Sequence, residues 1–176
     1  YIHPMTYEEF LVAKGQHQMC NMLTSRQWDV MASTRSMYVQ SLREYYFTGG
    51  MPEAVKKHLE TNDTVQVREV QKEILLAYDK DISKHAPTNE AVRINQVWKS
   101  IPAQLAKENR KFIYGAVRKG ARAKDFEIAI QWLLDAGLVY KVDRVSKPGM
   151  PLGCYADFAS FKLYMLDCGL LGAMND

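Results

Sequence analysis

The sequence predicts a mainly α-helical protein, with a helical, lid-like subdomain (residues 1–87) followed by a winged-helix domain (residues 88–176) that carries a small β-hairpin. Helical periodicity and helix-capping residues dominate the chain up to about residue 106. After residue 108, short segments with strand character appear. From residue 88 onward the expected order is helix, short strand, short helix, helix, strand, loop, strand, which is the order of a winged helix.

The first expected helix begins after Thr6, a good N-cap residue, and Glu9 stands three positions later, where a capping box requires it. This helix is expected to end near Gly15. Residues 16–34 lack clear periodicity and predict one short helix plus a connection. Residues 35–47 predict a further helix.

A glycine doublet, Gly49-Gly50, separates this helix from the next one. Two glycines permit a turn with positive φ, and Pro52 suits the first position of a helix, where its missing N–H costs nothing. The helix from Pro52 is expected to run to about Glu60. No Lys-Ser or Lys-Thr follows the glycines, so they do not form a phosphate-binding loop. We therefore interpret Gly49, Gly50 and Pro52 as a structural turn.

Two longer helices are expected next. Asn62-Asp63 caps a helix that stops by Pro87, with an apolar stripe typical of an amphipathic helix. Thr88 is expected to cap the following helix, which Pro102 bends or restarts. Apolar residues recur along both of them: Val67, Val70, Ile74, Tyr78 and Ile82 on the first, and Ile94, Val97, Trp98 and Ile101 on the second.

The winged-helix elements follow. A short strand is expected at Lys111–Tyr114 and a brief helix at Ala116–Lys119. The third helix is expected at Lys124–Ala136, with Gly137 as its C-terminal cap. The remaining elements are strands at Leu138–Val145 and Phe161–Leu166, a wing at residues 146–160, and a final helix over Gly169–Met174 capped by Asp167.

Charge is distributed unevenly along the chain, although its net value is only +3. Residues 107–124 contain seven basic side chains and one acidic one, whereas residues 125–176 contain four basic and seven acidic ones. The basic segment has two open interpretations, a surface that contacts a phosphate backbone or a solvated surface around a loop. The candidate DNA or phosphate contacts are Arg118, Lys119, Arg122 and Lys124.

Several enzyme classes find no support in the sequence. A phosphate-binding loop, a Cys-x-x-Cys pair and a Gly-x-Ser-x-Gly elbow are absent, and the four histidines lack ligand spacing. Asp79 and Asp81 lie about 200° apart on their helix, so they cannot share a metal. We therefore predict no catalytic, cofactor-binding or metal-binding residue.

The cellular setting is inferred from composition. With 47% hydrophobic and 24% charged residues the chain is typical of a globular protein, and no apolar run is long enough for a membrane span. Three cysteines and no secretory signal favour reduced thiols and a cytoplasmic location, without a membrane partner. The first residue is Tyr1 rather than Met, so we expect a piece of a longer polypeptide.

Four segments, in this order, resemble a known family. They are His3-Pro4-Met5-Thr6-Tyr7-Glu8-Glu9-Phe10-Leu11, Gly49-Gly50-Met51-Pro52-Glu53-Ala54-Val55, Tyr78-Asp79-Lys80-Asp81-Ile82 and Phe161-Lys162-Leu163-Tyr164-Met165-Leu166-Asp167-Cys168-Gly169-Leu170-Leu171. Nearly the whole chain is similar to the region that follows the ATPase core in predicted bacterial and archaeal AAA-type ATPases, the domain of unknown function 4143 family.

This resemblance implies a parent protein with three parts. A P-loop ATPase core would precede Tyr1 and would bind ATP and Mg²⁺, and a region similar to restriction endonucleases would follow Asp176. The family's nucleotide-binding residues belong to the missing core, so no ATP site is carried over to this chain.

Three hypotheses for the function follow. The first is a non-catalytic regulatory and interaction module of the parent ATPase, with the ATPase core and the nuclease-like region as its partners. The second is a DNA-binding winged helix that uses residues 107–124. Asp125, Glu127 and Asp135 argue against it, because they would lie along the recognition helix and repel phosphates. The third, an independent enzyme, is disfavoured by the missing motifs.

Overall fold

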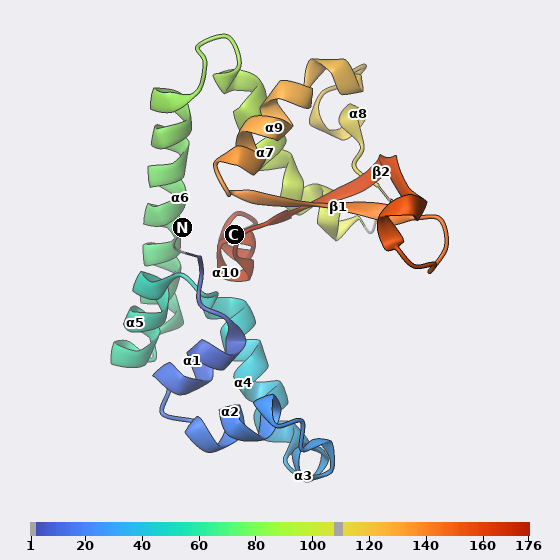
Figure 1. Cartoon of the computed structure of the whole chain (residues 1–176). Helices are drawn as coiled ribbons and strands as arrows, with labels where there is room; N and C mark the ends of the chain where they lie inside the picture. Colours follow the sequence, from blue (N-terminus) through green and yellow to red (C-terminus); the bar gives the residue numbers. More distant parts are fainter. Residues whose placement is uncertain (1–2, 108–110) are drawn as a thin grey trace. The chain divides into compact units, whose positions relative to one another are not determined.

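The computed structural model describes residues 3–107 and 111–176 (Figure 1). Within them the protein is mainly helical, with ten α-helices, two short 3-10 helices and one two-stranded antiparallel sheet. The chain forms two compact units. The first unit is Tyr1–Leu75 with Asp167–Asp176, and the second unit is Leu76–Leu166. This grouping does not test the expected division into domains 1–87 and 88–176, which stays a prediction.

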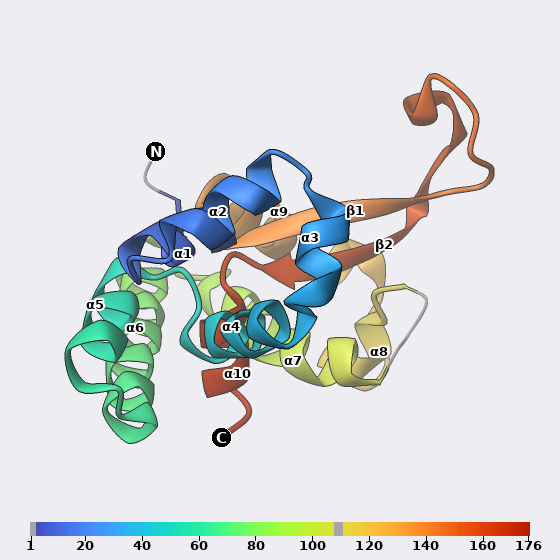
Figure 2. The same cartoon turned by 90° about the horizontal axis from the view of Figure 1, so that it is seen from below.

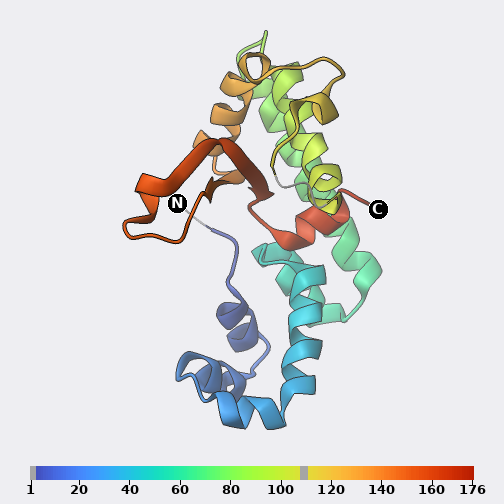
Figure 3. The same ribbon diagram turned by 90° about the vertical axis from the view of Figure 1, so that its right-hand side faces the viewer.

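The first unit is all helical in its described part. Its elements are α1 (Tyr7–Ala13), α2 (His17–Thr24), α3 (Trp28–Ser33), α4 (Arg35–Thr48), α5 (Pro52–Thr61), α10 (Cys168–Ala173) and the first part of α6 (Thr64–His85). Helix α10 packs beside α4, although the two are far apart in the sequence (Figure 3). One core cluster joins α1, α2 and α4 through Leu11, Met19, Cys20 and Tyr38, and a second joins α5 and α6 through Ala54, Val67 and Val70.

Local sequence signals explain several helix starts in this unit. The Thr6 hydroxyl accepts a hydrogen bond from the Glu9 N–H, and the Glu9 carboxylate accepts one from the Thr6 N–H, so the expected capping box is confirmed. Pro52 occupies the first turn of α5. The Asp63 carboxylate accepts a hydrogen bond of 2.8 Å from the Val65 N–H at the start of α6. Residues 16–34 differ from expectation, because they hold two helices, α2 and α3, rather than one.

The second unit combines helices with the β-hairpin. Its elements are the end of α6, α7 (Ala91–Ala106), α8 (Tyr114–Val117), η1 (Ala123–Asp125), α9 (Glu127–Asp135), β1 (Val139–Val145), η2 (Leu152–Tyr155) and β2 (Ala156–Met165). Helix α7 packs against α9 and β2, and α9 packs against β1. The loop at the tip of the hairpin reaches away from α7 and α9 (Figure 2).

The two strands pair in antiparallel register from Val139 opposite Met165 to Val145 opposite Ala156, with an irregularity between Asp143 and Arg144. Buried Phe161, Leu163 and Met165 lie on one face of β2. The core of the unit beneath this face is made of large apolar side chains from α7 and α9 and the residues before them: Ile94, Val97, Trp98, Ile101, Phe126 and Leu133.

Two expected helix starts are wrong. Helix α7 begins at Ala91, and its N-cap residue is Glu90 rather than the expected Thr88, because the Pro87 carbonyl accepts from both the Glu90 and Ala91 N–H groups and closes a turn first. Pro102 lies inside α7, which continues to Ala106. The expected third helix is divided into η1 and α9 at Phe126, which has a non-helical φ of −131° and a fully buried ring.

The strand expectations also need correction. Lys111–Tyr114 is not a strand: Phe112 makes one backbone hydrogen bond to β2, from its N–H to the Phe161 carbonyl (2.6 Å), and Tyr114 already starts α8. The Ile113 N–H donates to the Gln104 side-chain oxygen (2.8 Å). Strand β2 begins at Ala156, earlier than the expected Phe161, so the hairpin loop is shorter than the expected wing.

Candidate functional site

Four basic residues of the second unit form what we call the cation cluster: Arg118, Lys119, Arg122 and Lys124. They follow α8 and lead through η1 towards α9, and all four are exposed. The chain reverses here at Gly120, whose φ of +79° is the left-handed region that favours glycine. The Arg122 N–H donates to the Asp125 carboxylate (2.8 Å), which fixes the start of η1.

The charges of the cation cluster are not neutralised within the described residues. None of its members forms an ion pair there, and the one recorded charge contact is the Arg118 guanidinium 5.7 Å from the centre of the Phe126 ring. Lys107 and Lys111 are exposed as well, whereas Arg110 and Glu108 lie outside the described residues. Among the described residues the cluster therefore has no acidic partner, and an exposed group of cations suits an anionic partner.

The exposed side of α9 has a different character. Glu127 and Asp135 are exposed carboxylates, and Ile128 is an apolar side chain with 63% of its surface exposed. The Gln131 amide donates to the Asp135 carboxylate (2.7 Å), so the side chain best suited to read a base already has a partner. This surface offers carboxylates and apolar area rather than phosphate-binding groups.

A pocket of about 230 Å³ lies between α9 and the hairpin, and we call it the α9 pocket. The Lys141 ammonium lies 4.8 Å from the Phe161 ring centre, and the Phe158 ring is 69% exposed. Burial, followed by the charge of Glu127, raises the pKa of the Tyr114 hydroxyl. Its lining combines aromatic, aliphatic and charged side chains: Tyr114, Glu127, Ile130, Gln131, Leu134, Lys141, Phe158 and Phe161. Ligand pockets are usually larger than about 300 Å³, so this one suits a single side chain of a partner.

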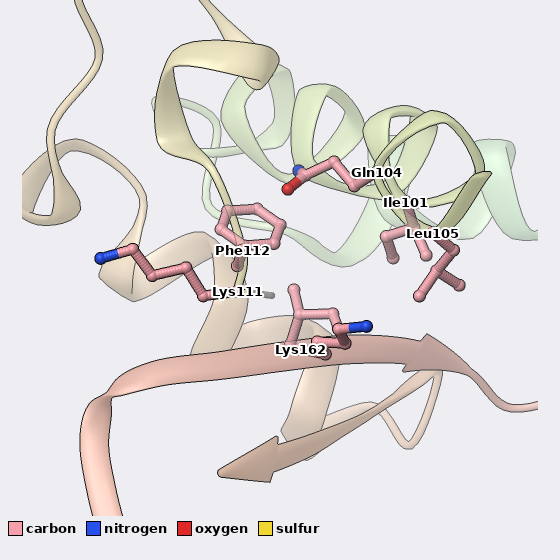
Figure 4. Close-up of a pocket in the computed structure, with 7 residues that line it drawn as sticks. Ile101, Gln104, Leu105, Lys111, Phe112 and Lys162 are labelled. Carbon is pink, nitrogen blue, oxygen red and sulfur yellow. The ribbon is translucent and has the colours of Figure 1, made fainter. Parts of the chain in front are cut away.

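A smaller cavity between α7 and β2 has a structural role (Figure 4). Its volume is only about 10 Å³, which leaves no room for a ligand larger than water. The Gln104 and Phe112 side chains lie beside each other there, and the Lys111 side chain extends away from them in Figure 4. The Phe112 ring stacks on Phe161 with the ring centres 5.6 Å apart. These contacts hold the segment before α8 against β2.

In the first unit, the sequence-predicted turn residues lie where three segments meet. We call this place the glycine joint, and it is formed by Met5, Gly49, Gly50 and Asp167. Gly49 has a φ of +74°, and a Cβ there would overlap the Asp167 carboxylate. Gly50 does not have a positive φ, but a Cβ there would overlap the Met5 carbonyl oxygen. The Gly50 carbonyl accepts from the Met5 N–H (2.6 Å). The joint therefore requires both glycines, each for a different reason, and Pro52 opens α5 just beyond it.

Asp167 completes the glycine joint from the far end of the chain. Its buried carboxylate accepts hydrogen bonds from the Gly50 N–H (2.6 Å) and, as the expected cap of α10, from the Leu170 N–H (2.8 Å). Burial raises the pKa of Asp167, and these backbone N–H groups oppose that rise. The Tyr45 hydroxyl donates to the Met5 carbonyl (2.8 Å), and burial raises the pKa of Tyr45 to about 12 and that of Cys168 to about 11. Both groups stay neutral near pH 7.

Two further polar side chains, His58 and Asp79, each lie beside a charged side chain of the described residues. His58 is buried, stacks on Phe10, and lies 3.9 Å from the Glu44 carboxylate. Asp79 forms an ion pair with Lys99 (3.4 Å). Within residues 3–107 and 111–176, no three His, Cys, Asp or Glu side chains come together as metal ligands. None of the helices in this part of the chain has the length and apolar character needed to cross a membrane.

Comparison with known proteins identifies a family. The family described as "Domain of unknown function (DUF8612)" matches residues 39–176, from α4 to the end of the chain. The chain belongs to this family. The DUF8612 match includes the cation cluster, the α9 pocket and most of the glycine joint, but not Met5. No curated protein and no solved structure matches the chain. The DUF8612 description states no activity, so the resemblance to AAA-type ATPases stays a prediction.

Proposed function

We propose that the chain is a non-catalytic regulatory and interaction module of a larger AAA-type ATPase, built from a helical lid-like subdomain and a winged-helix domain. The observation that carries this proposal is the surface of α9. In a winged helix this surface is the recognition surface, and here it presents two carboxylates, an exposed isoleucine and a side-chain-sized pocket. These groups suit a protein partner.

The order of elements in the second unit supports the winged-helix part of this proposal. Helix α7, the Phe112 segment, α8, α9, β1, the loop and β2 follow one another in the expected sequence. The hydrogen bond from the Phe112 N–H to the Phe161 carbonyl puts the segment before α8 alongside β2, where a third strand of a winged helix would pair. A winged helix serves protein contacts as well as DNA contacts, so the fold alone does not choose between them.

The glycine joint supports the family resemblance behind this proposal. Three of the four segments that carry the resemblance meet there, through Met5, Gly50 and Asp167. The resemblance therefore coincides with a physical feature of the first unit. On this proposal ATP and Mg²⁺ bind to the parent's ATPase core, the core and a nuclease-like region are the partners, and the protein is cytoplasmic.

The test uses the full-length parent protein and measures its ATP hydrolysis. Ile128→Glu and Phe158→Ala alter the exposed side of α9 and the α9 pocket, so we expect each to change turnover several-fold while the melting temperature stays the same. Val92→Glu is the matched control, because Val92 is 66% exposed on α7. A parent without ATPase activity, or equal turnover in all three variants, would contradict the proposal.

A second function, DNA binding, is favoured by one observation. The four members of the cation cluster are exposed, and no acidic side chain of the described residues pairs with them. Titration of the 176-residue chain with duplex DNA at about 50 mM salt distinguishes the two functions, because phosphate contacts are strongest at low salt. Saturable binding that is lost on neutralising the cluster would support DNA binding. The absence of binding would favour the interaction module.

A further inference from the structure

Strand β1 has one free edge within the second unit. The sheet has two strands in the described part of the chain, and β1 pairs there with β2 alone. An unpaired strand edge presents a row of backbone N–H and C=O groups that another strand can use. The residues on this edge therefore decide which partner can pair with it.

Two hydrogen bonds at the ends of β1 show which of its backbone groups point to β2 and which point to the free edge. The Leu138 carbonyl accepts from the Leu166 N–H (3.1 Å), and the Ser146 N–H donates to the Tyr155 carbonyl (2.8 Å). Leu138 and Ser146 flank β1 on either side and are both even-numbered, and the direction of the backbone groups alternates along an antiparallel strand. Val139, Lys141, Asp143 and Val145 therefore direct their N–H and C=O groups away from β2.

The sequence of β1 is complementary to itself when two copies run antiparallel. In Val139-Tyr140-Lys141-Val142-Asp143-Arg144-Val145, every residue has a suitable opposite when Val142 faces Val142 of a second copy. Lys141 then faces Asp143, Tyr140 faces Arg144, and Val139 faces Val145. Opposite charges, cation–aromatic pairs and β-branched pairs are the cross-strand pairs that stabilise sheets.

We propose that β1 is a self-pairing edge, through which two copies of this chain form an antiparallel dimer with the twofold axis at Val142. The hydrogen-bonded pairs would be Val139 with Val145 and Lys141 with Asp143, which are the residues whose backbone groups face the free edge. Their four pairs, counted from both copies, supply about eight backbone hydrogen bonds. The result is a continuous four-stranded sheet.

Neighbouring registers are disfavoured by charge. The same edge residues can also pair with Lys141 on the axis or with Asp143 on the axis. Each of these places two like charges directly opposite each other, which destabilises a sheet. The register at Val142 has no like-charge pair. This inference does not depend on the proposed function, since it concerns backbone pairing between copies of β1. The Lys141 side chain also lines the α9 pocket, whereas Val142, which lies on the proposed axis, does not.

Exposed apolar area agrees with this dimer. On the face of β1 that carries the even-numbered residues, Tyr140 is 48% exposed and Val142 is 53% exposed. Pairing places the two Val142 side chains in contact on the axis and covers part of both. On the other face, Lys141 already forms an ion pair with Asp143 of its own chain (3.0 Å), and the second copy would extend this pair into a network of four charges.

The experiment measures the oligomeric state of the 176-residue chain by sedimentation equilibrium from about 10 µM to 1 mM, since small interfaces are weak. We expect a reversible dimer. Lys141→Asp gives each copy two acidic edge residues, and Asp143→Lys gives each copy two basic ones, so each variant alone should be monomeric. An equimolar mixture of the two should form a one-to-one dimer, because every charged pair is then between opposite charges.

This mixture separates pairing between copies from effects within one chain. Neither variant regains its own Lys141–Asp143 ion pair in the mixture, so recovery there reports only contacts between copies. Lys84→Asp is the control, because it makes the same charge change at an exposed site at the end of α6, and it should leave the dimer unchanged.

A further variant tests the dimer independently, in case the charge variants do not fold. Val142→Glu leaves the Lys141–Asp143 ion pair intact and faces Lys162 of its own chain, but it sets two glutamates together on the axis and should also give a monomer. A wild-type chain that is monomeric up to about 1 mM overturns the proposal. So does a dimer that survives Val142→Glu, or a mixture of folded charge variants that stays monomeric.

Discussion

The glycine joint and the cation cluster differ in where their polar groups lie: the joint buries them, and the cluster exposes them. At the joint, three segments far apart in the sequence meet, and one buried carboxylate accepts two backbone N–H groups. In the cluster, four cations close together in the sequence stay exposed, and none forms an ion pair within the described residues. The joint satisfies its polar groups internally, whereas the cluster leaves its charges available to a partner.

This difference predicts opposite responses to mutation. A buried donor or acceptor that loses its partner costs free energy of folding, while an exposed charge contributes little to stability. Changes in the glycine joint should therefore lower the free energy of unfolding. Changes in the cation cluster should leave that free energy unchanged and should alter binding.

The largest effect is expected for Gly50→Val. The new side chain would overlap the Met5 carbonyl oxygen, so the Gly50 backbone must move away from both Met5 and Asp167. We expect a loss of about 3 kcal/mol or more in the free energy of unfolding, measured with urea.

Gly120→Ala, in the turn between Lys119 and Arg122, is the control for this variant. Gly120 has a positive φ, but a Cβ there has no neighbour within 4 Å, so only backbone strain of about 1 kcal/mol is expected. Equal losses for the two variants would show that close approach to Met5 does not matter.

The next effect is expected for Asp167→Ala. This change removes the N-cap of α10 and leaves the buried Gly50 N–H without an acceptor. We expect a loss of about 2–3 kcal/mol in the free energy of unfolding. Thr6→Ala removes the exposed cap of α1 and should cost only about 1 kcal/mol. If both variants cost the same, Asp167 acts as an ordinary helix cap and the bond to Gly50 adds nothing.

A smaller effect on the free energy of unfolding is expected at His58, which is buried and lies 3.9 Å from the Glu44 carboxylate. Burial lowers its pKa below the usual value of about 6.5, with Lys14 acting in the same direction and Glu44 against it. The unfolded chain therefore binds a proton more readily than the folded one. The contribution of neutral His58 to the free energy of unfolding is therefore complete above about pH 6.5. It is lost as the pH falls from there through the lower pKa of the folded state.

His58→Leu should remove this dependence. Urea unfolding of the wild type and the variant between about pH 5 and pH 8 measures it, and the wild type should lose more stability on the acidic side. Lys14 and Glu44, which form an ion pair with each other, remain in both proteins and serve as the internal reference. Parallel pH profiles would show that His58 titrates equally in the folded and unfolded chain.

Sequence patterns predicted the features that depend on neighbours within a few residues. The Thr6–Glu9 capping box, the start of α5 at Pro52 and the cap of α10 at Asp167 all agree with the structure. Each of these needs only one helical turn of sequence. The density of cations before α9 was likewise visible in the sequence.

Features that depend on distant contacts were not predictable in this way. Asp167 and the Gly50 N–H are 117 positions apart, and no local pattern reveals that pairing. The glycine doublet suggested a turn, yet only the approach of Met5 explains why Gly50 has no side chain. His58 is buried by Phe10 and its neighbours, and Phe112 is held by β2, so tertiary packing decided both.

The smallest effect on stability is expected for neutralising the whole cation cluster. Replacing Arg118, Lys119, Arg122 and Lys124 with glutamine should change the free energy of unfolding by less than about 0.5 kcal/mol, because the four side chains are exposed. Any larger loss would show that the cluster supports the fold. If the variant and the wild type have the same free energy of unfolding, a difference in binding between them is due to the lost charges and not to a disturbed fold.

The same variant decides what the cluster binds. On the interaction-module proposal the cations face acidic residues of the ATPase core, so the wild-type chain should show no saturable DNA binding at about 50 mM salt, and Arg122→Glu in the parent should weaken attachment of the core. If the cluster faces DNA instead, each cation contributes one phosphate contact. The slope of log K against log salt would then fall by ~3–4 units in the variant, at about 0.9 per phosphate. Carboxylates on α9 make the first outcome the expected one, because Glu127 and Asp135 would repel the phosphates beside them.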